Sequence, residues 1–281
     1  MAKYLLHNFM IDEHVKEALK EDIGFGDIST DFLATNKDLM TLYLNAREDG
    51  VLCGIDVFKR VFKILSNKIE LEIYHTDGDK IRKGDRIAKI TGAARFLLTG
   101  ERTALNYVQK MSGIATKTAE YANELQGTKA KISDTRKTTP GFRMFEKYAV
   151  KVGGGKMHRF NLSDCVMLKD NHIAFAGSIK NAVKKVRDNI SHTHKIEVEC
   201  DTKAQVKEAL EAKADIIMLD NMSLEDMKEC VKIIDGKAII EASGGVKIET
   251  VKKIAETGMD IISTSDIVMG AKPLDFGLDD K

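Results

Sequence analysis

Short apolar runs alternate with amphipathic segments through the second half of the chain. Each run has the length of a buried strand, and most are followed by a segment whose apolar residues have helical spacing. Such alternation predicts parallel βα units, which either close into a barrel or spread as an open doubly wound sheet. Since a full barrel has eight strands, we expect an incomplete one. The expected strands are 131–134, 166–168, 196–198, 216–219, 238–241 and 261–263, and the expected helices are 178–190, 203–213, 223–234 and 247–257.

The first half of the chain has a different pattern. Residues 11–20 have helical spacing, and residues 39–99 alternate apolar and polar positions between turns rich in Gly and Asp. This predicts half-buried strands in a small sheet, with V-F-K-R-V-F-K-I-L as a helix on it. The segment 100–122 is expected to form one or two helices, with Arg102 near the start of the first. There its charge would oppose the helix dipole, so we expect an anion nearby.

One hairpin, G-D-K-I-R-K-G-D-R-I, looks like those of lipoyl and biotin carrier domains. It lacks the lysine in a tight turn, flanked by Met or Ala, that an attached group would need. We interpret it as shared architecture, with a carrier or binding module as an alternative function.

Charge and cysteine content narrow the class of protein. The 281 residues carry 44 Lys and Arg against 43 Asp and Glu, and this near neutrality is unlike a general nucleic-acid-binding protein. The four cysteines form no C-x-x-C pair, which favours reduced thiols over disulfides or a zinc site. The first residues have too short an apolar run for a signal peptide, and no stretch approaches a membrane span. We expect a soluble, cytoplasmic protein.

Positive charge is concentrated between Ser133 and Ile173. An exposed helix face is the ordinary explanation of such a run. Here, however, the cations stand in short polar blocks beside glycines or at the ends of apolar runs, which is typical of ligand-binding loops at strand ends. We expect them to bind anions. The cations are Arg136, Lys137, Arg143, Lys147, Lys151, Lys156, His158, Arg159 and Lys169.

Residues just past the carboxyl ends of parallel strands face the ligand in folds of this class. Every residue at these positions is polar or glycine. The segment A-S-G-G-V is suited to phosphate, because glycines let backbone N–H groups approach an anion without a Cβ in the way; a plain turn is the alternative. The positions are Asp134, Arg136, Lys137, Lys169, Asp170, His172, Glu199, Asp201, Asp220, Asn221, Ser243, Gly244, Gly245, Ser265 and Asp266.

Several of these side chains allow more than one role. Glu199 and Asp220 either form salt bridges with Lys137 or Lys169, or hold Mg²⁺ or a sugar hydroxyl. Lys169 could be the amine nucleophile of a Schiff-base aldolase, although that chemistry needs a desolvated amine and the surrounding cations indicate an anion site instead. His158 is either structural or catalytic.

At these residues the chain resembles a known family, nicotinate-nucleotide pyrophosphorylase (carboxylating), also called quinolinate phosphoribosyltransferase. The resemblance is collinear from about residue 20 to the C-terminus, and several long motifs in order are more specific than any one alone. The matching segments are G-E-R-T-A-L-N-Y-V-Q-K-M-S-G-I-A-T, D-T-R-K-T-T-P-G-F-R, K-Y-A-V-K-V-G-G-G-K-M-H-R-F-N-L-S-D, L-K-D-N-H, I-E-V-E-C-D-T, L-D-N-M and E-A-S-G-G-V.

The resemblance implies an α/β fold with an N-terminal α/β sandwich domain (1–110, joined by the tail 271–281) and an open seven-stranded α/β barrel (111–270). It implies a homodimer or a hexamer built as a trimer of dimers, with shared active sites. The implied reaction converts quinolinate and phosphoribosyl pyrophosphate, with Mg²⁺, to nicotinate mononucleotide, pyrophosphate and CO₂ in de novo NAD biosynthesis. Neither nucleic acid nor membrane is an expected partner.

The resemblance also implies a role for each site residue. Arg136, His158 and Arg159 would bind quinolinate, with Arg102 reaching in from the partner subunit. Catalysis would rest on Lys137 and Lys169, which also bind phosphates, and on Glu199 and Asp220 at the ribose and metal. The remaining phosphate-binding residues would be Ser243, Gly244, Gly245, Thr264 and Ser265.

One segment departs from the family pattern. Many relatives read I-S-x-G-x-x-T-H-S near the end, whereas this chain has I-S-T-S-D-I-V-M-G, with Ser265, Val268, Met269 and Gly270 at the four changed positions. The departure puts the second half of the phosphate loop in question. It also keeps open a pyrophosphorylase-like paralogue associated with molybdate transport.

Overall fold

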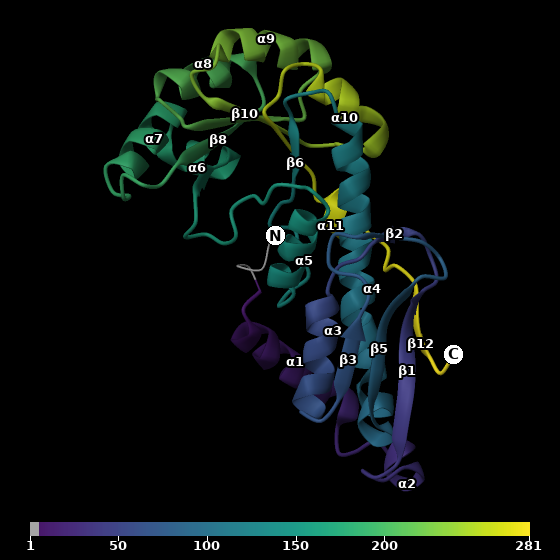
Figure 1. The fold of residues 1–281 in the computed structure, drawn as a ribbon. Helices are drawn as coiled ribbons and strands as arrows, with labels where there is room; N and C mark the ends of the chain where they lie inside the picture. Colours follow the sequence, from purple (N-terminus) through teal and green to yellow (C-terminus); the bar gives the residue numbers. More distant parts are fainter. Residues whose placement is uncertain (1–5) are drawn as a thin grey trace. The chain divides into compact units, whose positions relative to one another are not determined.

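The computed structural model describes residues 6–281, which form two compact units (Figure 1). The first unit contains the chain up to Ala119, then Thr139–Gly154 and Ala271–Lys281. The second contains Glu120–Thr138 and Gly155–Gly270. Residues 139–154 thus group with the first unit, whereas the sequence-based boundary at 110 assigned them to the barrel.

An antiparallel sheet forms the centre of the first unit. Its strand order is β12-β1-β5-β3, so the last strand of the chain pairs with the first. Period-two alternation puts Leu42, Leu44 and Ala46 of β1 in the core. The strands are β1 (Leu39–Ala46), β3 (Glu70–Ile73), β5 (Arg86–Ala93) and β12 (Phe276–Asp279), with a separate pair of β2 (Gly50–Val51) and β4 (Lys80–Ile81).

The helices of this unit follow the predicted apolar spacing. Helix α3 (Ile55–Leu65) buries one face, including Phe58 and Phe62, and α1 (Asn8–Ile23) packs against it (Figure 1). The short α2 is Thr30–Leu33. Helix α4 (Ala94–Glu124) is one continuous element that begins well before residue 100. Arg102 therefore lies beyond the first turn, and the predicted conflict with the helix dipole was wrong because the helix starts earlier than the glycine suggested.

Part of the cation-rich segment is helical. Helix α5 spans Arg143–Val152, and Lys147 within it is 1% exposed. The interpretation of the segment as strand-end loops was therefore wrong for Arg143, Lys147 and Lys151. It fails there because aromatic residues of α5 supply a helical apolar face, with Phe145 and Tyr148 buried.

The second unit is built on a six-stranded parallel sheet in the order β6-β11-β10-β9-β8-β7. All six predicted strands are present. The first strand of this unit, β6, pairs with its last strand, β11. An isolated parallel bridge between Ser133 and Lys156 adds a single-residue pairing to β6, in place of a full seventh strand. The strands are β6 (Lys131–Ser133), β7 (Val166–Leu168), β8 (Ile196–Cys200), β9 (Ile216–Asp220), β10 (Ile239–Ser243) and β11 (Ile261–Ser263).

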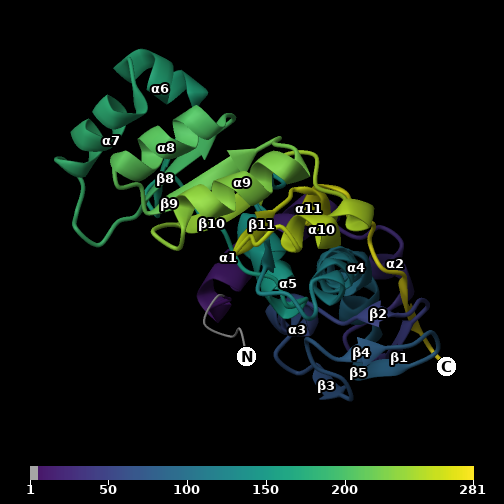
Figure 2. The same ribbon diagram turned by 90° about the horizontal axis from the view of Figure 1, so that it is seen from above.

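Helices connect these strands, as βα units require. Helices α7, α8 and α9 lie side by side along the sheet, and the seen-from-above view shows the same succession (Figure 2). Ser178, Thr202 and Ser223 cap their N-termini through side-chain oxygens that accept backbone N–H groups. The helices are α6 (Asp170–Ala176), α7 (Ile179–Arg187), α8 (Lys203–Glu211), α9 (Leu224–Ile234), α10 (Ile248–Ala255) and α11 (Asp266–Met269).

The segment that resembled a carrier-domain hairpin does not form a hairpin, because β4 pairs with β2 whereas β5 pairs with β1 and β3. Side chains of its own turns hold it. Asp79 accepts the backbone N–H of Thr76 at 2.7 Å, and Asp85 accepts that of Arg82 at 2.8 Å. These contacts explain the repeated Gly-Asp pairs as turn chemistry. No helix within residues 6–281 is both long enough and apolar enough to cross a membrane.

Candidate active site

Polar side chains gather at the carboxyl ends of the parallel strands of the second unit. With one exception, the site residues predicted from the sequence belong to this unit. The exception is Arg102, which lies exposed on α4 in the first unit. The carboxyl ends of the strands are the usual position of the active site in a βα fold.

Two arginines lie close enough to repel each other. Burial is the largest influence on the pKa of Arg159 and lowers it, and the positive charge of Arg136 lowers it further. The Nε atom of Arg136 is buried and, among the described residues, has no hydrogen-bond partner. A buried N–H without a partner costs about 1–3 kcal/mol. An anion between the two guanidinium groups would remove both penalties.

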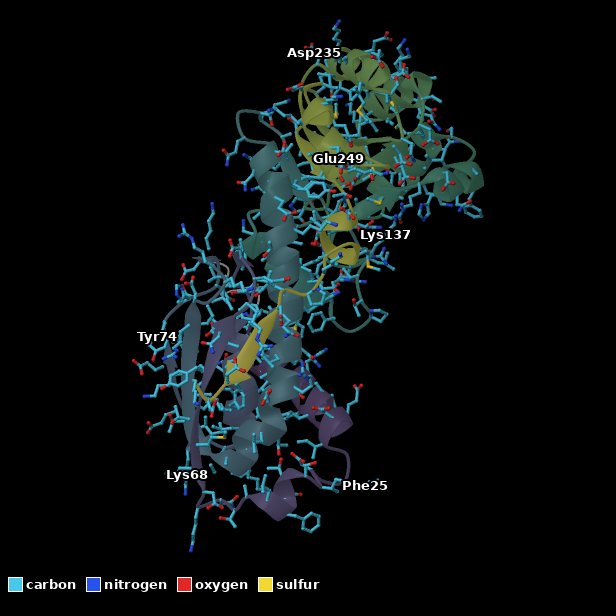
Figure 3. The ribbon with its side chains drawn as sticks, turned by 90° about the vertical axis from the view of Figure 1, so that its right-hand side faces the viewer. Phe25, Lys68, Tyr74, Lys137, Asp235 and Glu249 are labelled. Atoms are coloured by element: carbon cyan, nitrogen blue, oxygen red, sulfur yellow. The ribbon has the colours of Figure 1, made fainter. Side chains whose placement is uncertain are left out.

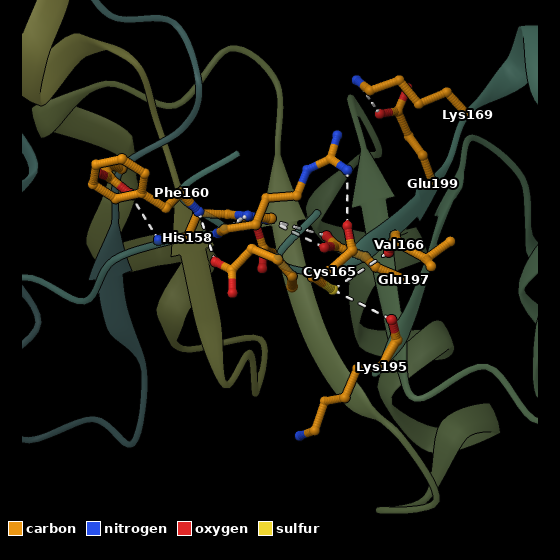
Figure 4. Close-up of polar contacts among 12 residues, drawn as sticks. His158, Phe160, Cys165, Val166, Lys169, Lys195, Glu197 and Glu199 are labelled. Carbon is orange, nitrogen blue, oxygen red and sulfur yellow. Dashed lines mark hydrogen bonds and ion pairs between the residues drawn. The ribbon is translucent and has the colours of Figure 1, made fainter. Parts of the chain in front are cut away.

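His158 directly precedes Arg159 in the chain and contacts two buried carboxylates. Its Nε2 atom is 3.2 Å from Oε2 of Glu197 and 3.4 Å from Oε1 of Glu241 (Figure 4). Burial alone would lower the pKa of His158, but hydrogen bonds and charge from the two glutamates outweigh it and raise the pKa to about 10. Burial also raises the pKa of Glu197, although the bond from His158 opposes that shift.

The backbone around His158 is fixed at several points. The His158 N–H donates to Oδ1 of the buried Asp134 at 2.7 Å, and the Arg159 N–H donates to Nδ1 of His158 at 2.7 Å. Arg159 also donates from Nη1 to the carbonyl of Cys165 at 2.9 Å (Figure 4). Arg159 is therefore held both at its backbone N–H and at its guanidinium group.

Two carboxylates and a lysine lie at the ends of β7, β8 and β9. Lys169 donates from Nζ to Oε2 of Glu199 at 2.9 Å (Figure 4), and Asp220 accepts Nδ2 of Asn221 at 2.7 Å. An ion-paired ammonium that is 46% exposed is poorly suited to Schiff-base chemistry, which needs a desolvated neutral amine. Lys169 is better suited to bind an anion.

The glycine segment after β10 makes a tight turn. Gly244 and Gly245 have φ values of +86° and +61°, in the left-handed region, and a Cβ on Gly244 would lie 2.2 Å from Oδ1 of Asn221. Such a turn presents backbone without side chains, as phosphate binding requires. The preceding Ser243 ends the strand and is partly buried.

The segment that departs from the family pattern forms the short helix α11. Thr264 is buried, and its Oγ1 accepts the Asp266 N–H at 3.2 Å. Asp266 in turn accepts a hydrogen bond from the Tyr121 hydroxyl at 2.7 Å, and Ser265 precedes the helix. Asp266 is thus tied to an internal hydroxyl group.

Lys137 extends from the loop after β6 and is exposed (Figure 3). Its backbone N–H donates to Oγ1 of Thr135 at 3.0 Å. The loop therefore has a local turn that presents the ammonium group to solvent, where a charged substrate can reach it.

Sequence reasoning missed Glu197 and Glu241 as parts of this site. Both lie inside predicted strands, where an acid is costly to bury without a partner. That is the signal that could have identified them. In addition, I-E-V-E places Glu197 and Glu199 two residues apart on one face of β8.

Comparisons with known proteins agree with this fold. The family model "Quinolinate phosphoribosyl transferase, N-terminal domain" matches residues 27–112, and the model of the C-terminal domain matches residues 114–279. A probable nicotinate-nucleotide pyrophosphorylase [carboxylating] of Methanothermobacter thermautotrophicus is 40% identical, over 94% of this chain and 97% of that protein. Its namesake in Bacillus subtilis is 40% identical, over 99% and 92%.

Solved structures give the same result in three dimensions. NadC from Streptococcus pyogenes superposes with a TM-score of 0.95 at 43% identity, covering 98% of this chain and 97% of that one. The nicotinate-nucleotide pyrophosphorylase from Ehrlichia chaffeensis gives a TM-score of 0.91 at 43% identity, covering 95% and 97%. The two family models together match residues 27–112 and 114–279. The chain therefore belongs to the quinolinate phosphoribosyl transferase family.

Proposed function

We propose that this protein transfers a phosphoribosyl group from phosphoribosyl pyrophosphate to quinolinate, with loss of CO₂, to give nicotinate mononucleotide and pyrophosphate. The proposal is supported by family membership and by the names of its relatives. The observation that carries it is the pair of mutually repelling arginines, Arg136 and Arg159, at the carboxyl ends of the strands. A small dianion would neutralise that pair.

Quinolinate is bound through its two carboxylates in this proposal. Arg136 and Arg159 supply guanidinium forks, which match carboxylates in a planar, bidentate geometry. His158 backs Arg159 through the hydrogen bond at Nδ1. With its carboxylates held, the ring nitrogen of quinolinate is oriented toward the sugar.

The phosphoribosyl donor lies across the glycine turn in this proposal. Gly244 and Gly245 offer backbone to the 5′-phosphate, and Ser243, Thr264 and Ser265 line the same end of β10 and β11. Lys137 and Lys169 bind the pyrophosphate group and stabilise the charge that develops as it leaves. The altered residues from Ser265 to Met269 place a helical turn where many relatives have a different sequence.

The proposed reaction has two steps, phosphoribosyl transfer and then decarboxylation. The ring nitrogen attacks C1 of the ribose, and the bond from C1 to the pyrophosphate oxygen breaks with its electron pair on the departing oxygen. The nitrogen is then positively charged, so the electron pair released when the adjacent carboxylate leaves as CO₂ is stabilised by the ring. The ring carbon then takes up a proton from water. Electrostatic preorganisation by the cations is the main contribution of the protein.

Glu199 and Asp220 have the chemistry to hold Mg²⁺ together with substrate phosphates. Mg²⁺ in enzymes of phosphorylated substrates commonly binds one or two carboxylates and keeps several waters, and these two side chains end adjacent strands. When bound, the ion would neutralise phosphate charge. Glu199 also holds Lys169 in place by the 2.9 Å ion pair.

The protein is proposed to act in the cytoplasm as a homodimer, or a hexamer of three dimers, in which Arg102 completes the site of the partner subunit. Mixing an Arg102→Ala protein with a Lys137→Ala protein should then restore activity, because one site in the mixed dimer keeps both residues. The measurement is product formation before and after subunit exchange. No recovery would mean that each subunit uses its own Arg102.

The experiment that tests the function follows CO₂ from quinolinate labelled at the carboxylate next to the ring nitrogen. With phosphoribosyl pyrophosphate and Mg²⁺, the protein should release labelled CO₂ and nicotinate mononucleotide in equal amounts. Omission of phosphoribosyl pyrophosphate is the control, since decarboxylation depends on the new nitrogen charge. Release of CO₂ without the second substrate, or no release at all, would contradict the proposal.

A further inference from the structure

A buried trio of side chains includes His158 and two glutamates that have no role in the reaction as set out above. It consists of His158, Glu197 and Glu241, whose ligand atoms all lie within 4.8 Å of one another. Glu197 comes from β8 and Glu241 from β10, with β9 between them. Side chains of alternate strands share a layer in the interior of βα barrels, which explains why these two meet.

Burial makes this trio costly. The side chains of Glu197 and Glu241 are 0% and 5% exposed, and that of His158 is 9% exposed. Two buried carboxylates in one layer repel each other, and charges taken out of water are expensive even when paired. Apolar residues at these positions would cost less, so stability alone gives no reason for glutamates here.

The tautomer of His158 follows from its neighbours. In the neutral ring, Nδ1 accepts the Arg159 N–H at 2.7 Å and the single ring proton is at Nε2, where the same two glutamates that raise the pKa of His158 favour a proton. Nε2 then has one proton to donate, and the nearest acceptors are the two glutamates, at 3.2 and 3.4 Å. Both ring nitrogens are therefore used within the protein.

A continuous chain of contacts leads from these carboxylates to the substrate side. Nε2 hydrogen-bonds to Oε1 of Glu197 at 3.4 Å and lies in ion-pair range of Glu241, also at 3.4 Å. On the other side of the ring, Nδ1 contacts the Arg159 N–H, and Arg159 is close enough to Arg136 to feel its charge. The far end of Arg159 is fixed separately, by the Cys165 carbonyl at 2.9 Å. Rotation of the His158 ring would release one of the two anchors of Arg159.

We propose that Glu197 and Glu241 are positioning residues for quinolinate binding, which clamp the His158 ring so that Nδ1 fixes Arg159 beside Arg136. This inference rests on the proposed function. Neither glutamate touches the substrate, and each acts through His158. Their two carboxylates from alternate strands brace the ring from two sides, which a single hydrogen bond could not do.

A metal ion is the other occupant that such a trio could suit. A histidine nitrogen that binds a metal must offer its lone pair, so Nε2 would have to be free of its proton. The hydrogen bond from Arg159 to Nδ1 places the proton on Nε2 instead. The geometry therefore favours a clamp made of protein groups.

The test compares Michaelis constants for the two substrates in the wild type and in Glu241→Ala, Glu241→Gln and Glu197→Ala. Each alanine variant should raise KM for quinolinate about tenfold, since a lost anchor of a charged side chain costs on the order of 1.4 kcal/mol. KM for phosphoribosyl pyrophosphate should stay within about twofold. Glu241→Gln should recover most of the loss, because the amide oxygen still accepts the Nε2 proton.

A double variant separates positioning from simple folding effects. If Glu241 acts only through His158, adding Glu241→Ala to a His158→Asn protein should change KM for quinolinate by less than about twofold. Asp215→Asn is the matched control, a carboxylate that accepts a backbone N–H of β8 at the other end of the strand. It should lower the melting temperature and leave both KM values unchanged.

Three outcomes would overturn the inference. They are unchanged KM for quinolinate in both alanine variants, an equal rise of both KM values, and additive effects in the double variant. Stoichiometric metal retained by the wild type and lost in Glu241→Ala would also replace the clamp with a metal site. An inactive wild type would remove the proposed function as well, whereas an active wild type with unaffected variants would remove this inference alone.

Discussion

The two ends of the parallel sheet in the second unit treat charge in opposite ways. At the amino end, Asp215 pairs with Arg187 at 2.6 Å and Asp260 pairs with Lys129 at 2.7 Å. Both aspartates also accept backbone N–H groups of strands, Ile196 at 2.8 Å and Ile240 at 2.9 Å. Every one of these charges has a partner in the protein.

At the carboxyl end, like charges face each other. Burial and then the charge of Arg136 lower the pKa of Arg159, and the buried Nε of Arg136 lacks a partner among the described residues. The comparison teaches that one end is arranged for stability and the other for a ligand that completes it. Although Lys169 is paired with Glu199, the two arginines are left with mutual repulsion and an unpartnered Nε, so stability is lost there in exchange for function.

The largest effects are expected when one arginine at each end of the sheet is replaced by alanine. Arg136→Ala should lower kcat/KM for quinolinate by about 10²–10³-fold, because a buried charge pair with the substrate is lost. Its thermal stability should be unchanged or higher, since repulsion with Arg159 is relieved. Arg187→Ala, at the amino end, should do the reverse and lower stability with activity unchanged. Steady-state kinetics and thermal unfolding of both variants check the prediction.

Similar changes of stability and activity in Arg136→Ala and Arg187→Ala would contradict the proposed difference between the two ends of the sheet. A loss of stability in Arg136→Ala as large as that in Arg187→Ala would mean that the carboxyl-end arginine is a structural residue. An equal rise of KM for both substrates would also contradict its assignment to quinolinate.

The next effect in size concerns Asp215, which accepts hydrogen bonds from both Arg187 and the buried Ile196 N–H. Asp215→Ala should reduce the free energy of unfolding by about 2 kcal/mol, mostly because the backbone N–H loses its partner. Denaturant unfolding measures this. Activity per folded molecule should match the wild type, and a changed KM would show that the amino end also influences the site.

A smaller contrast compares two glycines with left-handed backbones. Gly244→Ala should raise KM for phosphoribosyl pyrophosphate roughly tenfold, because its Cβ would lie 2.2 Å from Oδ1 of Asn221 and displace the turn. Gly236, at the amino end, has φ +72° and no atom within 4 Å of an added Cβ. Gly236→Ala should cost about 1 kcal/mol of stability through backbone strain and leave both KM values unchanged. Equal KM changes in the two variants would argue against a phosphate role for Gly244.

The smallest expected effect is a gain in stability from a substitution at Lys213. Lys213, also at the amino end, has φ +60°, a conformation that a side chain disfavours. Lys213→Gly should raise the free energy of unfolding by up to about 1 kcal/mol and leave kinetics unchanged. Differential scanning calorimetry at matched concentrations resolves such a shift. A loss of activity would show that this exposed lysine contributes to the site, which the comparison of the two ends excludes.

The sequence by itself determined the six strands of the second unit and four of its helices, but not α6 or α11. The six strands and helices α7, α8, α9 and α10 follow from the spacing of apolar residues, because a buried strand and an amphipathic helix each bury a face with its own period. Lys169 and Glu199 could be named as strand-end residues for the same reason. Helix α6 has no buried residues, so no such spacing marks it. Family membership was already visible in the ordered motifs.

Only the tertiary structure decided which of these side chains act on one another. Spacing along the chain says nothing about strand order, so the meeting of Glu197 and Glu241 on His158 could not be predicted. The helical residues of 143–152 and the early start of α4 were missed because packing outweighs local composition. Whether a charge is stabilised depends on its neighbours in space. For His158 those neighbours come from β8 and β10, which are distant from it in the sequence.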